Sequence, residues 1–222
     1  MSSPQVTPAS LGKLPVALTL PDETWIQILL ELDYSELKES QRICKKLKGF
    51  IGGKEFDRVL YRAGPSTPAY DKGKKVLLHP MIEKTDGIFA ELEDARMLVW
   101  EGDDVKEHFP KDYPTILDEY ATRPASTQID IEIEDAPRER LPLLVKSTGI
   151  TVRDFFEHLA KFWSTPVSAQ NAEYGMAESG IKNAKDVNYT HILGAHYAWT
   201  SWYGGVAQGG DRTKVRAGPF DS

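Results

Sequence analysis

Cysteine, histidine and acidic side chains are the residues of this chain that could do chemistry, and their spacing forms no recognisable reactive site. Cys44 is the single cysteine, and no histidine or acid is spaced to form a relay with it, so a packing role is favoured. His191 and His196 lie five residues apart, which does not put them on one helix face, and no paired cysteines accompany them. The carboxylates give no pair that can be singled out. We therefore expect no catalytic residue, no metal and no cofactor.

An aromatic segment near residue 200 is the candidate for a ligand or substrate pocket. Trp199, Trp202 and Tyr203 are side chains that anchor ligands and peptides well. The alternative, that they complete a hydrophobic core, is equally consistent with the sequence. Gly204-Gly205 and Gly209-Gly210 lack the strand-to-helix context of a phosphate-binding loop. An enzyme with an unrecognised site would be sought here first.

Charge and composition argue against broad classes of partner. The net charge of -6 and the pI near 5.5 do not provide the basic surface that sequence-independent nucleic-acid binding needs. One cysteine cannot form an intramolecular disulfide, which favours a reducing compartment. Residues 1–10 lack the features of a secretory signal, and no apolar run is long enough to span a bilayer. We expect a cytoplasmic or nuclear protein without a membrane partner.

The segment from Leu20 to Leu60 carries more apolar surface than a small helical hairpin can bury. Pro21 suits the first helical position, and an apolar face with helical spacing follows it: Trp25, Ile28, Leu29 and Leu32. Ile26 and Leu30 form a second apolar row beside this face. A helix that is apolar around so much of its circumference is normally covered on more than one side.

Two further helices are expected after this one. Asp33 and Glu36 have the spacing of a capping box, so a second helix is predicted over 37–48. Gly52-Gly53 interrupts the pattern, and a short third helix is predicted over 55–61. The sequence thus predicts a small three-helix module.

A proline- and glycine-containing stretch over 64–69 marks the clearest boundary in the chain. It divides the sequence into a flexible tail over 1–19, the helical module over 20–63, a linker over 64–74 and a second domain over 75–222.

The second domain has mixed patterns typical of an α+β fold. Val76–Leu78 is a short apolar run, Ile129–Glu134 alternates strictly as a half-buried strand does, and Leu143–Val145 is a candidate antiparallel partner. Thr151 can cap an amphipathic helix that starts at Val152. The acidic stretch 83–107 is weakly periodic, and no structure is assigned to it. We expect a short antiparallel sheet with amphipathic helices.

The helical module resembles an F-box. Leu20-Pro21 and Glu23, then Ile28-Leu29 with Leu32-Asp33, then Leu37, and finally Ile43-Cys44-Lys45 follow the order of that family's pattern without a gap. The resemblance covers about one fifth of the chain. The remainder, including His79-Pro80 and Gly149–Asp154, resembles an uncharacterised domain common in mushroom-type fungal proteins, which implies a fold rather than an activity.

The F-box resemblance implies a non-enzymatic adaptor. F-box helices bind the Skp-type adaptor of a cullin ubiquitin ligase, while the rest of the protein holds a protein substrate that is unidentified here. The partner-binding residues implied are Leu20, Pro21, Trp25, Ile28, Leu29, Leu32, Leu37, Ile43, Cys44 and Leu47. The alternative is a self-contained binding or scaffold protein whose helical hairpin packs internally on the α+β domain.

Overall fold

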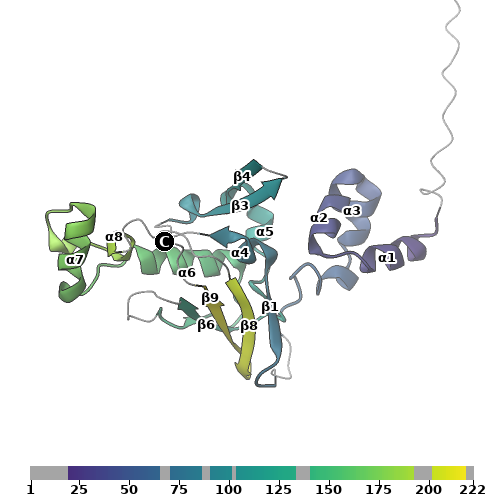
Figure 1. Ribbon diagram of the computed structural model, residues 1–222. Coiled ribbons are helices and arrows are strands. Elements are labelled where there is room, and N and C mark those ends of the chain that lie inside the picture. The colour runs from purple at the N-terminus through teal and green to yellow at the C-terminus, as the bar shows by residue number, and fades with distance from the viewer. Residues whose placement is uncertain are drawn as a thin grey trace, which may run out of the picture. The chain divides into compact units, whose positions relative to one another are not determined.

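The computed structural model describes residues 20–65, 71–86, 91–101, 104–133, 141–192 and 202–218. The chain divides into a helical unit that ends at Phe56 and an α+β unit that begins at Asp57 (Figure 1). Residues 57–63, which the sequence assigned to the helical module, therefore belong to the second unit. The reason is a set of contacts at Tyr61, whose hydroxyl donates to the Leu78 carbonyl oxygen at 2.6 Å. The expected tail over 1–19 lies outside the described residues.

The helical unit contains α1 (Asp22–Leu30), α2 (Tyr34–Ile43) and α3 (Lys45–Ile51), followed by the 3₁₀ helix η2 (Lys54–Phe56). Pro21 directly precedes α1, as its missing N–H favours. The Asp33 side chain accepts the backbone N–H of Glu36 at 2.9 Å, and the Glu36 carboxylate accepts that of Asp33 at 2.8 Å. This capping box starts α2, in agreement with the sequence pattern.

The predicted second and third helices differ from the observed ones. The single helix expected over 37–48 is broken at Cys44, whose backbone is extended with φ -158° and ψ 162°. The third helix expected over 55–61 is reduced to η2, followed by turns. Helix α3 ends at Ile51, before the glycine pair, and Phe56 rather than Tyr61 closes the helical unit.

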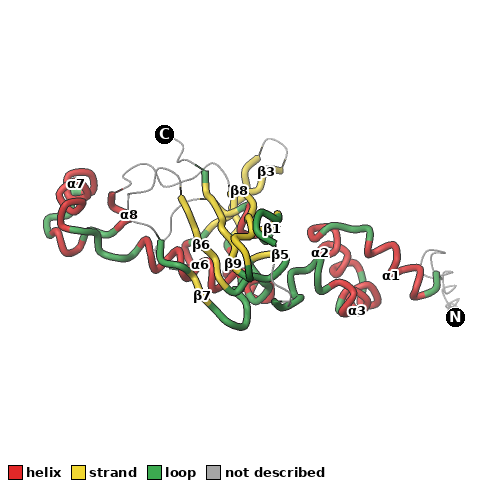
Figure 2. The backbone as a smooth tube through the Cα atoms, turned by 90° about the horizontal axis from the view of Figure 1, so that it is seen from below, coloured by secondary structure: helices red, strands yellow, loops and turns green. Residues whose placement is uncertain are grey.

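A six-stranded sheet forms the larger part of the α+β unit, in the order β5-β1-β8-β9-β6-β7. Its strands are β1 (Lys75–Leu78), β5 (Thr122–Arg123), β6 (Gln128–Ile133), β7 (Leu144–Val145), β8 (Trp202–Gly209) and β9 (Arg212–Ala217). All neighbouring strands are antiparallel except β6 and β9, which pair in parallel from Gln128↔Arg212 to Ile133↔Ala217. Figure 2 shows β6, β9 and β8 side by side.

This mixed sheet corrects the expectation of a short antiparallel one. The predicted strands at 76–78, 129–134 and 143–145 correspond to β1, β6 and β7, and β7 is the antiparallel partner of β6. The parallel pair was missed because β9 follows β6 only after a long intervening segment. Both strands alternate buried and outward residues, so their pairing places Ile131 next to Val215 on the buried side.

A second, three-stranded sheet lies in the region for which the sequence predicted no structure. It consists of β2 (Thr85–Asp86), β3 (Arg96–Glu101) and β4 (Asp104–His108), all antiparallel. The pairing of β3 with β4 runs from Met97↔His108 to Glu101↔Asp104, so the two strands form a hairpin. The sequence did not predict these strands because their alternation of apolar and polar residues is weak.

Helix α6 (Val152–Trp163) supplies the main apolar layer against the large sheet, as its amphipathic pattern predicted. It begins with a capping box between Thr151 and Asp154. Its buried face enters one core with Ile129 and Val215 of the sheet, and the Phe155 ring meets the Trp202 ring edge-on at 5.3 Å between centroids. The shorter helices are α4 (Pro80–Glu83), α5 (Pro114–Leu117), α7 (Ala169–Ser179) and α8 (Tyr189–Ile192). Within the described ranges, no helix has the length and apolar character needed to cross a bilayer.

Candidate functional site

Helix α1 presents apolar side chains on both sides of the one that it buries. Leu29 is buried, whereas its neighbours Ile28 and Leu30 are 44% and 41% exposed. Successive residues of a helix are about 100° apart, so Ile28 and Leu30 flank Leu29 symmetrically and widen the apolar arc to about 200°. The helical unit itself covers only the middle of that arc.

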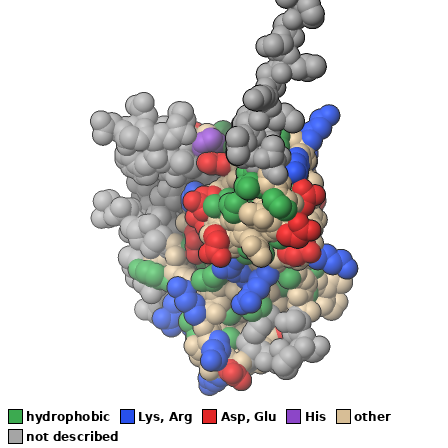
Figure 3. Space-filling model, turned by 90° about the vertical axis from the view of Figure 1, so that its right-hand side faces the viewer, with side chains coloured by type: hydrophobic (Ala, Val, Ile, Leu, Met, Phe, Trp, Pro, Cys, Tyr) green, Lys and Arg blue, Asp and Glu red, His purple; other side chains and the backbone are tan. Residues whose placement is uncertain are grey.

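Together, helices α2 and α3 likewise carry both buried and exposed apolar side chains. Leu37 and Leu47 are buried, together with Ile51 and Phe56 of the same unit. Ile43, the last residue of α2, is 72% exposed, and it precedes Cys44, the extended residue that separates α2 from α3. Figure 3 faces the helical unit and shows apolar side chains grouped between acidic ones. A group of exposed apolar side chains, rather than a single one, is what marks a surface that a partner protein buries.

The ten residues proposed for partner binding therefore form two groups. Leu29, Leu37 and Leu47 are buried within the chain, so they support the surface from below rather than contact a partner. Pro21, Ile28 and Ile43 are exposed, and Leu20, Trp25, Leu32 and Cys44 are half-buried. Leu30, which the sequence analysis counted as apolar but did not place at the interface, joins the exposed group.

Of the aromatic residues near position 200, the two that the structure describes, Trp202 and Tyr203, lie in different environments. Trp202 is buried in the core, where its indole N–H donates to the Thr85 carbonyl oxygen at 2.9 Å. Tyr203 follows it on β8 and is 48% exposed, because successive residues of a strand point to opposite faces. Trp199 lies outside the described residues. The alternative interpretation, that Trp202 completes the core, is the one that the structure favours.

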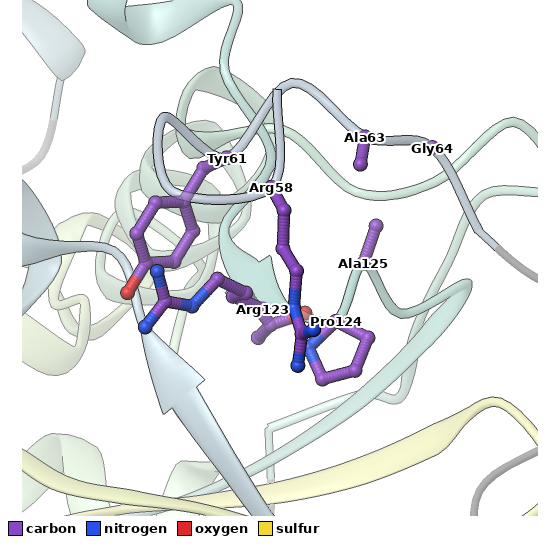
Figure 4. Close-up of a pocket in the computed structure, with 8 residues that line it drawn as sticks. Arg58, Tyr61, Ala63, Gly64, Arg123, Pro124 and Ala125 are labelled. Atoms are coloured by element: carbon purple, nitrogen blue, oxygen red, sulfur yellow. The ribbon is translucent and has the colours of Figure 1, made fainter. Parts of the chain in front are cut away.

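A pocket of about 330 Å³ lies in the α+β unit, formed by two segments that are distant in sequence (Figure 4). The first segment, 57–65, precedes β1, and the second, 122–125, contains β5 and the turn after it. The lining residues are Arg58, Tyr61, Ala63, Gly64, Thr122, Arg123, Pro124 and Ala125. Two guanidinium groups beside the apolar side chains of Ala63, Pro124 and Ala125 suit an anion with a short apolar portion.

Tyr61 fixes one wall of this pocket. Its φ of 55° lies in the left-handed region, which costs a non-glycine residue about 1–2 kcal/mol. Its carbonyl accepts the Tyr120 N–H at 2.7 Å, and its hydroxyl donates to Leu78 as described above. Burial raises the pKa of Tyr61 to about 12, although the nearby Arg123 acts in the opposite direction. The Arg123 guanidinium lies 5.5 Å from the Tyr61 ring centroid, in a cation–π contact.

The second wall, formed by residues 122–125, is held by hydrogen bonds among hydroxyl groups. The Thr122 hydroxyl donates to Ser126 Oγ at 3.0 Å and accepts the Ser126 N–H at 3.0 Å. Ser126 Oγ in turn lies 2.6 Å from the Thr213 hydroxyl of β9. The peptide bond between Arg123 and Pro124 is cis. These contacts hold the segment that carries Arg123 against the centre of the sheet.

A histidine and a carboxylate meet close to Tyr61, yet in a place that no substrate reaches. His79 Nε2 lies 3.1 Å from Glu119 Oε2, and both side chains are buried. The Met81 N–H donates to His79 Nδ1 at 3.1 Å, so Nδ1 is the acceptor and Nε2 carries the proton that Glu119 accepts. The His79 ring also packs edge-on against Tyr61 at 4.8 Å. This pair positions Tyr61 and is not arranged for proton transfer to a ligand.

The histidines weighed for metal binding form no cluster. His191 Nδ1 accepts the Asn188 N–H at 3.1 Å, and His196 lies outside the described residues. In the part of the chain that the structure describes, no group of three or more His, Cys, Asp or Glu side chains is arranged to hold a metal ion.

Comparisons of this chain with protein-family models, with curated proteins and with solved structures found no match. Function is therefore inferred from the two surfaces above, the apolar surface of the helical unit and the Arg58–Arg123 pocket. The sequence analysis missed the pocket because its arginines come from separate segments and neither belongs to a motif.

Proposed function

We propose that this protein is a substrate-recruiting subunit of a Skp-cullin-F-box ubiquitin ligase, bound to the Skp-type adaptor through its helical unit. The observation that carries the proposal is the exposure of Ile28, Leu30 and Ile43 on helices that bury Leu29 and Leu37 as their own core. The F-box-like pattern over 20–45 supports the same assignment, because its apolar positions include the buried Leu29 and Leu37 as well as the exposed Ile28 and Ile43. The α+β unit is then the part that holds a protein substrate, and no catalytic role is assigned to it.

The exposed apolar side chains can supply a useful share of a binding free energy. Fully burying an Ile or Leu side chain contributes about 1.5–3 kcal/mol, so completing the burial of three partly exposed ones contributes about 2–5 kcal/mol. Association costs at least as much in lost translational and rotational freedom. The half-buried Leu20, Trp25 and Leu32 must therefore join the interface for the complex to be stable.

Co-purification of the full chain with a Skp-type adaptor tests the proposal. The informative variant is Ile28→Asp combined with Ile43→Asp, because both side chains are exposed and their replacement leaves the core of the unit intact. Leu29→Asp is unsuitable, since Leu29 is buried and a charge there would unfold the unit. We expect the double variant to fold, as judged by circular dichroism, and to lose the adaptor.

Val145→Asp is the matched control. Val145 is 59% exposed on the edge strand β7 of the α+β unit, so the substitution makes the same chemical change away from the helical unit. Adaptor binding should survive it. Failure of the wild-type chain to bind any Skp-type adaptor, or full binding by the folded double variant, would refute the proposed function.

A further inference from the structure

We propose that the pocket lined by Arg58, Tyr61 and Arg123 binds the phosphate monoester of a small organic molecule. This site is separate from the proposed adaptor surface, since all its lining residues belong to the α+β unit. Figure 4 shows Arg58 extending from the 57–65 segment toward Pro124, and Arg123 lying beside the Tyr61 ring. The two positive charges of Arg58 and Arg123 would be balanced by one dianion, such as a phosphate monoester.

Unlike four other arginines that the structure describes, the two pocket arginines form no ion pair with a carboxylate. Arg62 pairs with Asp57, Arg153 with Asp118, Arg212 with Asp130 and Arg216 with Glu132. Among the residues that the structure describes, no carboxylate pairs with Arg58 or Arg123. In a chain of net charge -6, two such guanidinium groups in one pocket form a local positive site.

The geometry favours an organic phosphate over a free inorganic ion. Guanidinium groups bind phosphate oxygens in a two-pronged manner, which supplies the attraction. Ala63, Pro124 and Ala125 line the same cavity and offer apolar contact to a carbon skeleton. A volume of about 330 Å³ is at the lower end of the range for small-molecule sites, so the ligand is small.

The pocket is also built to keep its shape. Tyr61 is fixed through both its hydroxyl and its carbonyl oxygen, and its ring packs against the Arg123 guanidinium. The hydroxyl contacts of Ser126 hold the opposite segment to β9. Walls that are ordered before the ligand arrives reduce the entropy lost on binding.

Isothermal titration calorimetry of the full chain tests this assignment, with phenyl phosphate, inorganic phosphate and phenol as probes. We expect saturable binding of phenyl phosphate, weaker binding of inorganic phosphate and none of phenol. Arg58→Gln should weaken phenyl phosphate binding by about tenfold or more, as loss of a charge-assisted hydrogen bond does. Arg58 is exposed, so this variant should fold. Arg123→Lys, which retains the charge but not the two-pronged geometry, should weaken binding less.

Arg153→Gln is the control, because Arg153 pairs with Asp118 and does not line the pocket. Absence of saturable phenyl phosphate binding at millimolar concentration would overturn the proposal. So would equal loss of affinity in Arg58→Gln and Arg153→Gln, which would indicate general attraction to positive charge. Equal affinity for inorganic and phenyl phosphate would overturn the assignment of an organic ligand. None of these outcomes depends on adaptor binding.

Discussion

Replacing Tyr61 with phenylalanine removes one hydroxyl group and leaves the remaining contacts of that ring in place. The hydroxyl donates to the buried Leu78 carbonyl at 2.6 Å, whereas the packing on His79 and Arg123 involves only the ring. Loss of such a hydrogen bond costs about 1 kcal/mol, rising to about 3 kcal/mol if the carbonyl finds no other donor. For a domain of this size, each kcal/mol lowers the melting temperature by about 2–4 °C.

Thermal unfolding followed by circular dichroism measures this change. Tyr174→Phe is the matched control, because Tyr174 is 56% exposed and its hydroxyl makes no hydrogen bond to the described residues. We expect a lower melting temperature for Tyr61→Phe and an unchanged one for Tyr174→Phe. Equal melting temperatures for the two variants would show that the Tyr61 hydroxyl does not anchor the 57–65 segment.

The same residue predicts a dependence on alkaline pH. Burial raises the pKa of the Tyr61 phenol to about 12, above its value of about 10 in an unfolded chain. The neutral phenol therefore stabilises the fold fully below about pH 10, and this contribution is lost as the pH rises toward about 12. The ultraviolet titration of tyrosinate should contain a late step near pH 12 that Tyr61→Phe lacks. A late step that persists in the variant would assign it to another tyrosine.

Two further substitutions test the packing of the α+β unit. A Cβ atom at Gly205 would lie 2.6 Å from Thr213 Cγ2 and 3.2 Å from Val76 Cβ. Gly205→Ala should therefore lower the free energy of unfolding, measured by chemical denaturation, by about 1–3 kcal/mol. Gly204→Ala is the control and should have a smaller effect, because its Cβ would come no closer than 3.7 Å to any atom outside the adjacent residues. Burial alone would raise the pKa of Asp154, but its hydrogen bonds with Lys146 and Thr151 outweigh burial and lower it. Asp154→Ala should therefore cost about 1 kcal/mol at neutral pH. This deficit should shrink as the pH falls below about 4, because the Asp154 carboxylate of the unfolded chain is protonated there first and that of the folded chain, with its lowered pKa, only at lower pH. A deficit independent of pH would contradict the assignment.

The elements that the sequence predicted correctly are those with a strong local pattern. Strict alternation over 129–134 identified β6, and the capped apolar stripe from Val152 identified α6. The capping box at Asp33 marked the start of the second helix, but Cys44 carries no local signal of the break that follows. Local patterns specify elements well, because propensity and capping act over a few residues.

The features that the sequence did not predict depend on contacts between distant segments. The parallel pairing of β6 with β9 and the closure of the pocket by Arg58 and Arg123 both join residues that are far apart in the chain. The structure divides the chain after Phe56 rather than near residue 63 for the same reason, since Tyr61 is held by Leu78 and Tyr120. Of the two surfaces from which function is inferred, only the apolar helical surface has residues that cluster in sequence.

The position of β9 between β8 and β6 has a consequence for how the protein is made. Until residues 212–217 have been synthesised, β6 and β8 each lack a neighbour, and both present unpaired backbone groups. The large sheet therefore cannot be completed before residues 212–217 are synthesised, whereas all residues of the helical unit precede them in the chain. A chain truncated before β9 would keep the helical unit but leave one edge each of β6 and β8 unpaired, and such exposed strand edges promote aggregation.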